Sequence, residues 1–159
     1  MSAANFVGER GEALAYARLT DYQGLPRPLF RPYFLGARAQ TIDYLIELEG
    51  VSQPFTPYFF VQVKATAQVG RQPGRNLRVK VSLKDSALLV RYPAPTYILG
   101  IEERTGQGFI FAVTAGTTKA LSSLPTRHQM TIPTLQALHD EVLRFWQASG
   151  AAFTTSRFV

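Results

Sequence analysis

Residues 57–66 read Pro-Tyr-Phe-Phe-Val-Gln-Val-Lys-Ala-Thr and carry one of the two strongest strand patterns in the chain. Aromatic and β-branched side chains fit the pleated, half-buried surface of a sheet, so these residues predict a β-strand. Residues 41–49, Thr-Ile-Asp-Tyr-Leu-Ile-Glu-Leu-Glu, predict a second strand with partial alternation. Because a turn-rich connector at residues 50–54 separates the two, we expect them to pair as a hairpin.

Pairing of these strands brings polar side chains together. If the hairpin closes near Gly50 and Pro57, Asp43 lies roughly opposite Lys64. Residues i and i+2 share one face of a strand, so Gln62 and Lys64 point the same way. We therefore expect a carboxylate, an amide and an ammonium group to meet within a few ångströms.

Two interpretations fit this polar group. In the first, Asp43 and Lys64 form a simple ion pair near a sheet edge, because a half-buried lysine needs a partner. In the second, the carboxylate anchors a hard divalent cation and the amide oxygen of Gln62 helps to complete its shell. Such a cation polarises a phosphate and activates a water molecule, while the lysine orients that water or offsets charge on the phosphate.

The rest of the chain predicts helices and strands around this hairpin. We expect helices over residues 5–22 (with Asn5 as N-cap), 83–91 and 134–148 (starting at Pro133), and strands over 28–34, 77–82, 96–102 and 108–113. Residues 114–132 show no clear pattern. This order predicts one α/β domain over residues 1–159, with a core at about 5–115 and a central mixed sheet flanked by helices.

Positive charge is unevenly distributed along the chain. The net charge is +6, from 17 Lys and Arg against 11 Asp and Glu. Two stretches contain no acidic residue: residues 22–42, with Arg27, Arg31 and Arg38, and residues 50–84, with Lys64, Arg71, Arg75, Arg78, Lys80 and Lys84. A one-sided positive field attracts a polyanion such as DNA or RNA, although a solvated arginine-rich surface gives the same composition. The basic residues that follow Lys64 are candidate phosphate contacts: Arg71, Arg75, Arg78, Lys80 and Lys84.

Composition excludes several other classes of protein. The chain has no cysteine, which excludes disulfides, a thiol nucleophile and zinc–thiolate sites, and which is typical of a cytoplasmic protein. Its apolar runs are too short to cross a membrane, and the first residues lack the basic and then apolar pattern of a signal peptide. We therefore expect a cytoplasmic domain that does not interact with a membrane.

The polar residues follow the pattern of a known superfamily. The chain resembles the PD-(D/E)XK nucleases, in which an Asp starts one strand of a hairpin and an (E/D/Q)-x-K triplet lies on the next. Asp43 and the triplet from Gln62 to Lys64 match these positions, and the glutamine form is similar to the Mrr-type restriction endonucleases. Many members also carry a Glu on the first helix within a Gly-x-x-x-Glu pattern, which Gly8 and Glu12 match.

The resemblance implies a restriction-endonuclease-like fold and metal-dependent hydrolysis of nucleic acid, with DNA favoured over RNA. It implies that Glu12, Asp43 and Gln62 hold Mg2+ or Mn2+ and that Lys64 positions the attacking water. Gln62 replaces the usual acidic residue, so the metal affinity rests more on the other two. A homodimer or a partner protein would supply targeting. The alternatives are a non-cleaving nucleic-acid- or protein-binding module of the same fold, and a structural protein with an Asp43–Lys64 ion pair.

Overall fold

A mixed five-stranded sheet forms the centre of the part of the chain that this computed structural model describes, residues 3–52, 55–68, 76–149 and 155–157. The elements are α1 (Ala3–Thr20), β1 (Phe30–Phe34), the 3-10 turn η1 (Gly36–Arg38), β2 (Tyr44–Leu48), β3 (Tyr58–Thr66), α2 (Leu83–Leu89), β4 (Thr96–Glu102), β5 (Gln107–Val113) and α3 (Ile132–Ala148). The strands lie in chain order, with β3 and β4 parallel and the other neighbours antiparallel. The predicted α/β architecture with a central mixed sheet is confirmed.

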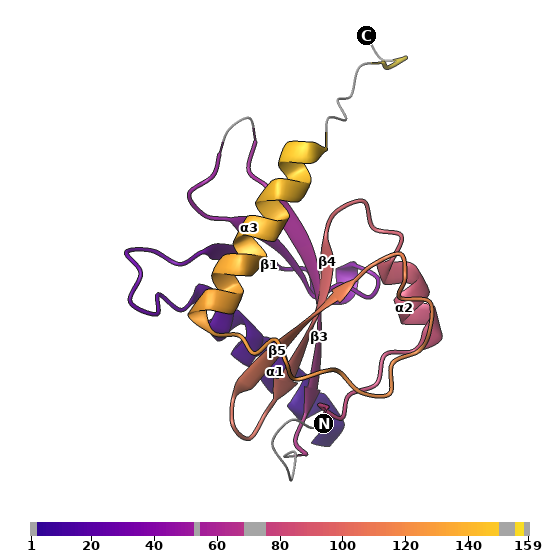
Figure 1. The fold of residues 1–159 in the computed structure, drawn as a ribbon. Coiled ribbons are helices and arrows are strands. Elements are labelled where there is room, and N and C mark those ends of the chain that lie inside the picture. The colour runs from indigo at the N-terminus through magenta and orange to yellow at the C-terminus, as the bar shows by residue number, and fades with distance from the viewer. Residues whose placement is uncertain (1–2, 53–54, 69–75, 150–154, 158–159) are drawn as a thin grey trace.

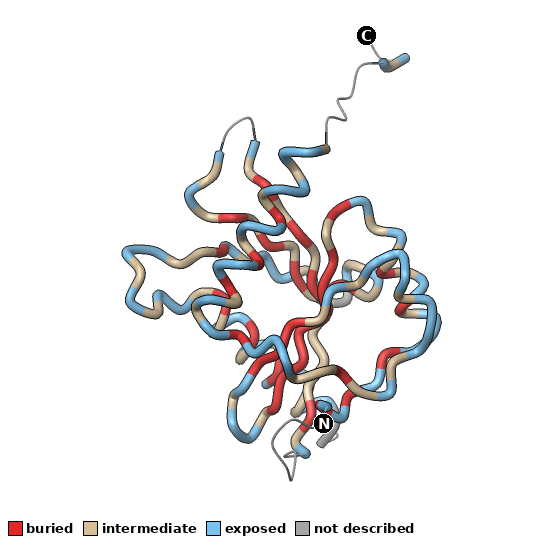
Figure 2. The backbone as a smooth tube through the Cα atoms, in the orientation of Figure 1, coloured by how far each residue is buried: buried red, intermediate tan, exposed pale blue. Residues whose placement is uncertain are grey.

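Helices cover both faces of the sheet (Figure 1). Side chains of α1 and α3, such as Leu19 and Leu138, pack with Val61 and Leu99 on one face. On the other face α2 and the extended segments 77–81 and 121–124 pack around Ile98. Buried residues follow the strands and the inner sides of the helices (Figure 2). None of the helices in the described ranges is long and apolar enough to cross a membrane.

Most of the predicted elements form, with shifted ends. β1 accommodates Pro32 because it is an edge strand of the sheet, where a missing N–H is tolerated. Pro133 lies in the first turn of α3, where its fixed φ suits a helix start. Asn5 does not cap the first helix, since α1 already begins at Ala3.

The predicted strand over residues 77–82 is wrong as a strand, although its alternation is correct. Leu77, Val79 and Val81 are buried, while Arg78 and Lys80 are exposed. The pairing consists of two isolated bridges, Leu77 with Leu124 and Val81 with Leu121. The alternation therefore reflects an extended segment that lies across the sheet with one side buried, rather than a member of the sheet.

The register of the β2–β3 hairpin differs from the predicted one by two residues. Tyr44 pairs with Val61, so Asp43 lies level with Gln62 instead of Lys64. The hairpin closes earlier than expected because the Leu48 N–H donates to the Pro57 carbonyl. Residues 63–66 of β3 therefore extend beyond β2 and pair with β4 alone. We call this part of β3 the free edge.

Candidate active site

Asp43 lies at the open end of the β2–β3 hairpin, where the free edge begins. Its N–H donates to the Val61 carbonyl at 2.9 Å, and its own carbonyl accepts from the Leu35 N–H at 2.8 Å. The carboxylate oxygen Oδ2 accepts from the Val63 N–H at 2.6 Å. The side chain thus takes the place of a strand partner for Val63, which fixes the carboxylate at the edge of the sheet.

The backbone just before Asp43 is strained. Thr41 has a φ of 60°, a left-handed conformation that is unusual for a β-branched residue. The Gln40 carbonyl accepts from the Thr41 hydroxyl at 2.6 Å and from the Tyr92 hydroxyl at 2.7 Å. Strain of this kind persists only where the surroundings enforce it, and it clusters at functional sites. These contacts hold the turn that delivers Asp43 to β3.

Helix α1 brings Glu12 to the same place. Gly11 lies so close to β3 that a Cβ at this position would overlap the Cβ of Ala65. The Tyr44 hydroxyl donates to the Glu12 carbonyl at 3.0 Å, which ties α1 to the start of β2. Burial raises the pKa of the Glu12 carboxyl, and the nearby charges of Asp43 and Glu9 raise it further.

Asp43 also resists ionisation. Burial raises its pKa, and the Val63 N–H and the charge of Lys64 oppose this effect only in part. Tyr44 senses both charges: burial first, and then the charges of Glu12 and Asp43, raise the pKa of its hydroxyl to about 12. Two half-buried carboxylates that repel each other favour a bound cation, because a cation offsets both the repulsion and the loss of hydration.

Lys64 influences Asp43 but does not pair with it directly. Among the described residues, direct ion pairs link Arg10 with Glu103 and Arg31 with Glu49, and His139 approaches Asp140. The Asp43–Lys64 ion pair of the structural interpretation is therefore not formed. Lys64 is half-buried on β3, level with Gly100 of β4. Since its ammonium group forms no direct ion pair with a described residue, it could act on a third group.

Gln62 has a buried oxygen without a donor. The side chain is 5% exposed, and its Oε1 atom accepts no hydrogen bond from the part of the chain that is described. A buried polar atom without a partner costs about 1–3 kcal/mol. A cation or an external donor at Oε1 would offset this cost.

A hard divalent cation prefers carboxylate and amide oxygens, and Glu12, Asp43 and Gln62 carry oxygens of these two kinds. The fit depends on the amide, because within the described ranges no group of three or more His, Asp or Glu side chains is placed to hold a metal ion. The three residues therefore offer two carboxylates and one amide oxygen, and a metal site would need the Oε1 atom of Gln62, which has no hydrogen-bond partner among the described residues.

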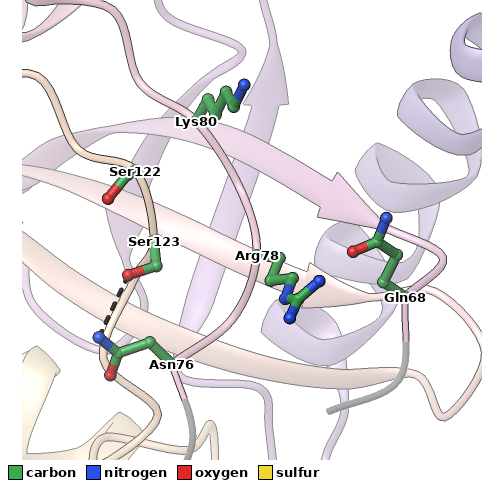
Figure 3. Close-up of a pocket in the computed structure, with 6 residues that line it drawn as sticks. All are labelled: Gln68, Asn76, Arg78, Lys80, Ser122 and Ser123. Atoms are coloured by element: carbon green, nitrogen blue, oxygen red, sulfur yellow. Dashed lines mark hydrogen bonds between the residues drawn. The ribbon is translucent and has the colours of Figure 1, made fainter.

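Part of the predicted phosphate-binding set gathers next to the end of β3. Arg78 and Lys80 line an open hollow of about 510 Å3 (Figure 3). The other lining side chains are polar: Gln68, Asn76, Ser122 and Ser123. Asn76 donates to the Ser123 hydroxyl at 3.2 Å, which joins the two segments. Lys84 is exposed on α2 and does not line this hollow, and Arg71 and Arg75 lie outside the described residues.

Several site residues were not predicted from the sequence. Tyr44 follows Asp43 directly, but its contact with Glu12 depends on how α1 packs. Ser122 and Ser123 lie in a segment without a clear sequence pattern. A usable signal existed for Tyr16, which lies one helical turn after Glu12 and hence on the same side of α1.

Removal of the Glu12 charge is expected to stabilise the metal-free protein at neutral pH. The pKa values of Glu12 and Asp43 lie above their ordinary values of 4.5 and 3.8. In the pH window between each ordinary value and the raised value, the folded chain therefore binds more protons than the unfolded chain. The free energy of unfolding therefore falls as the pH rises through the window and stays lower above it. Glu12→Gln should raise the Tm at pH 7 in EDTA, and the gain should shrink towards pH 4.

Thermal unfolding of the two proteins at both pH values measures this effect. Asp140→Asn is the matched control, because Asp140 has a 61% exposed side chain on α3 and should give little change at either pH. A lower Tm for Glu12→Gln at pH 7 would show that the carboxylate stabilises the fold, contrary to this expectation.

Comparisons with protein-family models, with curated proteins and with solved structures found no match. The function proposed below therefore rests on the residues of this chain and on the geometry of the free edge. The resemblance to the PD-(D/E)XK nucleases adds one argument for that function, which is the order of the motifs along the chain.

Proposed function

We propose that the chain is a metal-dependent nuclease of restriction-endonuclease-like fold that hydrolyses phosphodiesters, with DNA as the preferred substrate. The observation that carries the proposal is the grouping around Asp43, which interacts electrostatically with both Glu12 and Lys64 and lies level with Gln62, whose Oε1 atom accepts no hydrogen bond from a described residue. The order of α1 with Glu12, β2 preceded by Asp43, β3 with Gln62 and Lys64, and then α2 also agrees with the PD-(D/E)XK pattern.

Each residue has a distinct role in this proposal. Glu12, Asp43 and Gln62 would hold Mg2+ or Mn2+, which supplies charge for the phosphate and a more acidic bound water. The Val63 N–H keeps the Asp43 carboxylate in one orientation. Lys64 orients the attacking water and offsets the charge that develops on the phosphate.

In this proposal the hollow lined by Arg78 and Lys80 binds the nucleic acid. Arg78 and Lys80 would contact phosphates that flank the scissile bond, and the neutral side chains around them add hydrogen bonds. Contacts of this kind fix the position of the strand without reading its sequence. They also predict that the affinity falls as the salt concentration rises.

Nicking of DNA by purified protein tests the proposal. With Mg2+ or Mn2+ the wild type should cut, and Asp43→Asn should lower the rate by roughly a hundredfold or more, because a metal ligand loses its charge. The cation should also raise the Tm of the wild type but not of Asp43→Asn, since a ligand that binds only the folded state stabilises it. Asp140→Asn, which changes an exposed Asp, should behave as wild type.

A binding module of the same fold is the second candidate, and the neutral side chain of Gln62 favours it. That module would bind nucleic acid in a salt-dependent manner without cutting it. If clean protein with either cation leaves every form of DNA and RNA intact, the nuclease proposal is wrong and the binding module takes its place.

A further inference from the structure

Aromatic rings surround Tyr44, the residue that follows Asp43. Tyr44, which is buried, has the ring of Phe34 at 5.3 Å on one side and the ring of Tyr16 at 6.4 Å on another, measured between centroids. Phe34 is 58% exposed and Tyr16 is 47% exposed. We call these two exposed rings the aromatic platform. It adjoins the candidate site, because the buried ring between them belongs to the residue after Asp43.

The platform is exposed but well supported. Phe34 pairs with Tyr44 across β1 and β2, and its ring rests on Gly36, where a Cβ would lie 3.0 Å from the ring. Gly36 has a φ of +55°, which a glycine adopts without strain. Tyr44 is anchored by its hydrogen bond to the Glu12 carbonyl. Rings that are fixed before binding lose little conformational entropy when a flat ligand stacks on them.

A nucleic acid strand suits the exposed rings and the neighbouring arginine, with a bound cation offsetting the charges of Glu12 and Asp43. Phe34 lies in the acid-free stretch of residues 22–42, and the exposed Arg38 follows it on η1. The Leu35 N–H binds the Asp43 carbonyl, so the residue next to Phe34 contacts the candidate catalytic residue directly. A strand that stacks bases on the platform would therefore bring its phosphates to the carboxylates, with a cation between them.

We propose that the aromatic platform stacks unpaired bases, so the substrate of this site is DNA with unpaired nucleotides rather than intact duplex. This inference rests on the proposed nuclease function. The faces of bases inside a duplex are already stacked on their neighbours, and an external ring reaches them only where pairing is open. Stacking on aromatic side chains tolerates any base, so the platform would select strand state and not sequence.

Equilibrium binding tests the inference. Fluorescence anisotropy is measured with Mg2+ for a labelled unpaired DNA strand and for the duplex of the same sequence, in a Lys64→Ala background that slows cutting. We expect tighter binding of the unpaired strand. Phe34→Leu and Tyr16→Leu keep an apolar side chain but remove the ring, and each should weaken that binding by roughly tenfold or more. Duplex binding should not change.

Two control variants separate stacking from a general loss of structure. Phe34→Trp keeps a ring and should retain the affinity for the unpaired strand. Tyr22→Leu removes a ring that is 57% exposed but lies beyond the end of α1, and it should have no effect. Equal losses on both DNA forms, or no loss from Phe34→Leu, would overturn the inference. A wild-type dimer that becomes monomeric in Phe34→Leu would also overturn it, because a second copy would then cover the rings.

The outcomes distinguish this inference from the nuclease proposal. If the wild type cuts DNA but ring removal leaves the preference for unpaired strands unchanged, the platform is wrong and the nuclease remains. If the wild type cuts nothing but binds unpaired strands through Phe34 and Tyr16, the platform is correct and belongs to a binding module.

Discussion

Lys64→Ala is expected to lower the rate of DNA cleavage by about a hundred- to ten-thousandfold while the divalent cation still binds. The ammonium group acts on the attacking water and on the phosphate, so its loss removes acid–base and electrostatic help in the transition state. It does not remove an oxygen ligand. Lys64 also holds down the pKa of Asp43, which burial raises, so the variant should need a higher pH to bind the cation.

Single-turnover cleavage and a Mg2+ titration followed by Tm measure the two effects separately. Lys119→Ala is the matched control, because Lys119 is an exposed lysine in the segment between β5 and α3 and should leave both quantities unchanged. A variant at Lys64 that cuts normally but unfolds more easily would favour a structural role. If cation binding falls by as much as the rate, Lys64 supports the metal ligands and does not act on the water or the phosphate.

Local sequence patterns predicted the elements better than they predicted the register. Aromatic and β-branched runs defined β3, and the spacing of Gln62 and Lys64 placed them on one face. The register was wrong by two residues because the hairpin closes at Leu48 and Pro57, where the Leu48 N–H donates to the Pro57 carbonyl, instead of at Gly50 and Pro57. A slip of two residues keeps every side chain on the same face of the sheet, so the alternation within residues 41–66 does not distinguish the two registers.

The candidate site was also predicted only in part. Glu12, Asp43, Gln62 and Lys64 were predicted as a group, and the electrostatic coupling among the three charged members is consistent with that grouping. The supporting contacts were not predicted, since each joins segments that are distant in sequence. Tyr44 reaches the backbone of α1, and Asp43 binds the N–H of Val63 rather than the ammonium of Lys64. The close packing of Gly11 on Ala65 sets the position of the α1 backbone that carries Glu12.

Gly11→Ala is expected to destabilise the protein by about 1–3 kcal/mol and to weaken cation binding roughly ten- to a hundredfold. An alanine inside a helix normally stabilises it by about 0.8–1.0 kcal/mol relative to glycine. Here the added Cβ overlaps the Cβ of Ala65, a short side chain on a central strand that has no other rotamer. The helix must therefore move away from β3, at the cost of an overpacked contact. Glu12, the next residue, moves with it, and displaced supporting contacts lower metal affinity by this order.

Two further variants isolate the contact. Gly8→Ala, on the same helix, has open space at its Cβ and should stabilise the protein by about 0.8–1.0 kcal/mol. Ala65→Gly should restore the room that Gly11→Ala requires, so the double variant should bind the cation nearly as tightly as the wild type. Urea unfolding and Mg2+ titration are carried out on the wild type, Gly11→Ala, Ala65→Gly and the double variant, which form a double-mutant cycle between α1 and β3. If Gly11→Ala stabilises the fold as Gly8→Ala does, α1 is not held against the free edge, and the position of Glu12 beside Asp43 has another cause.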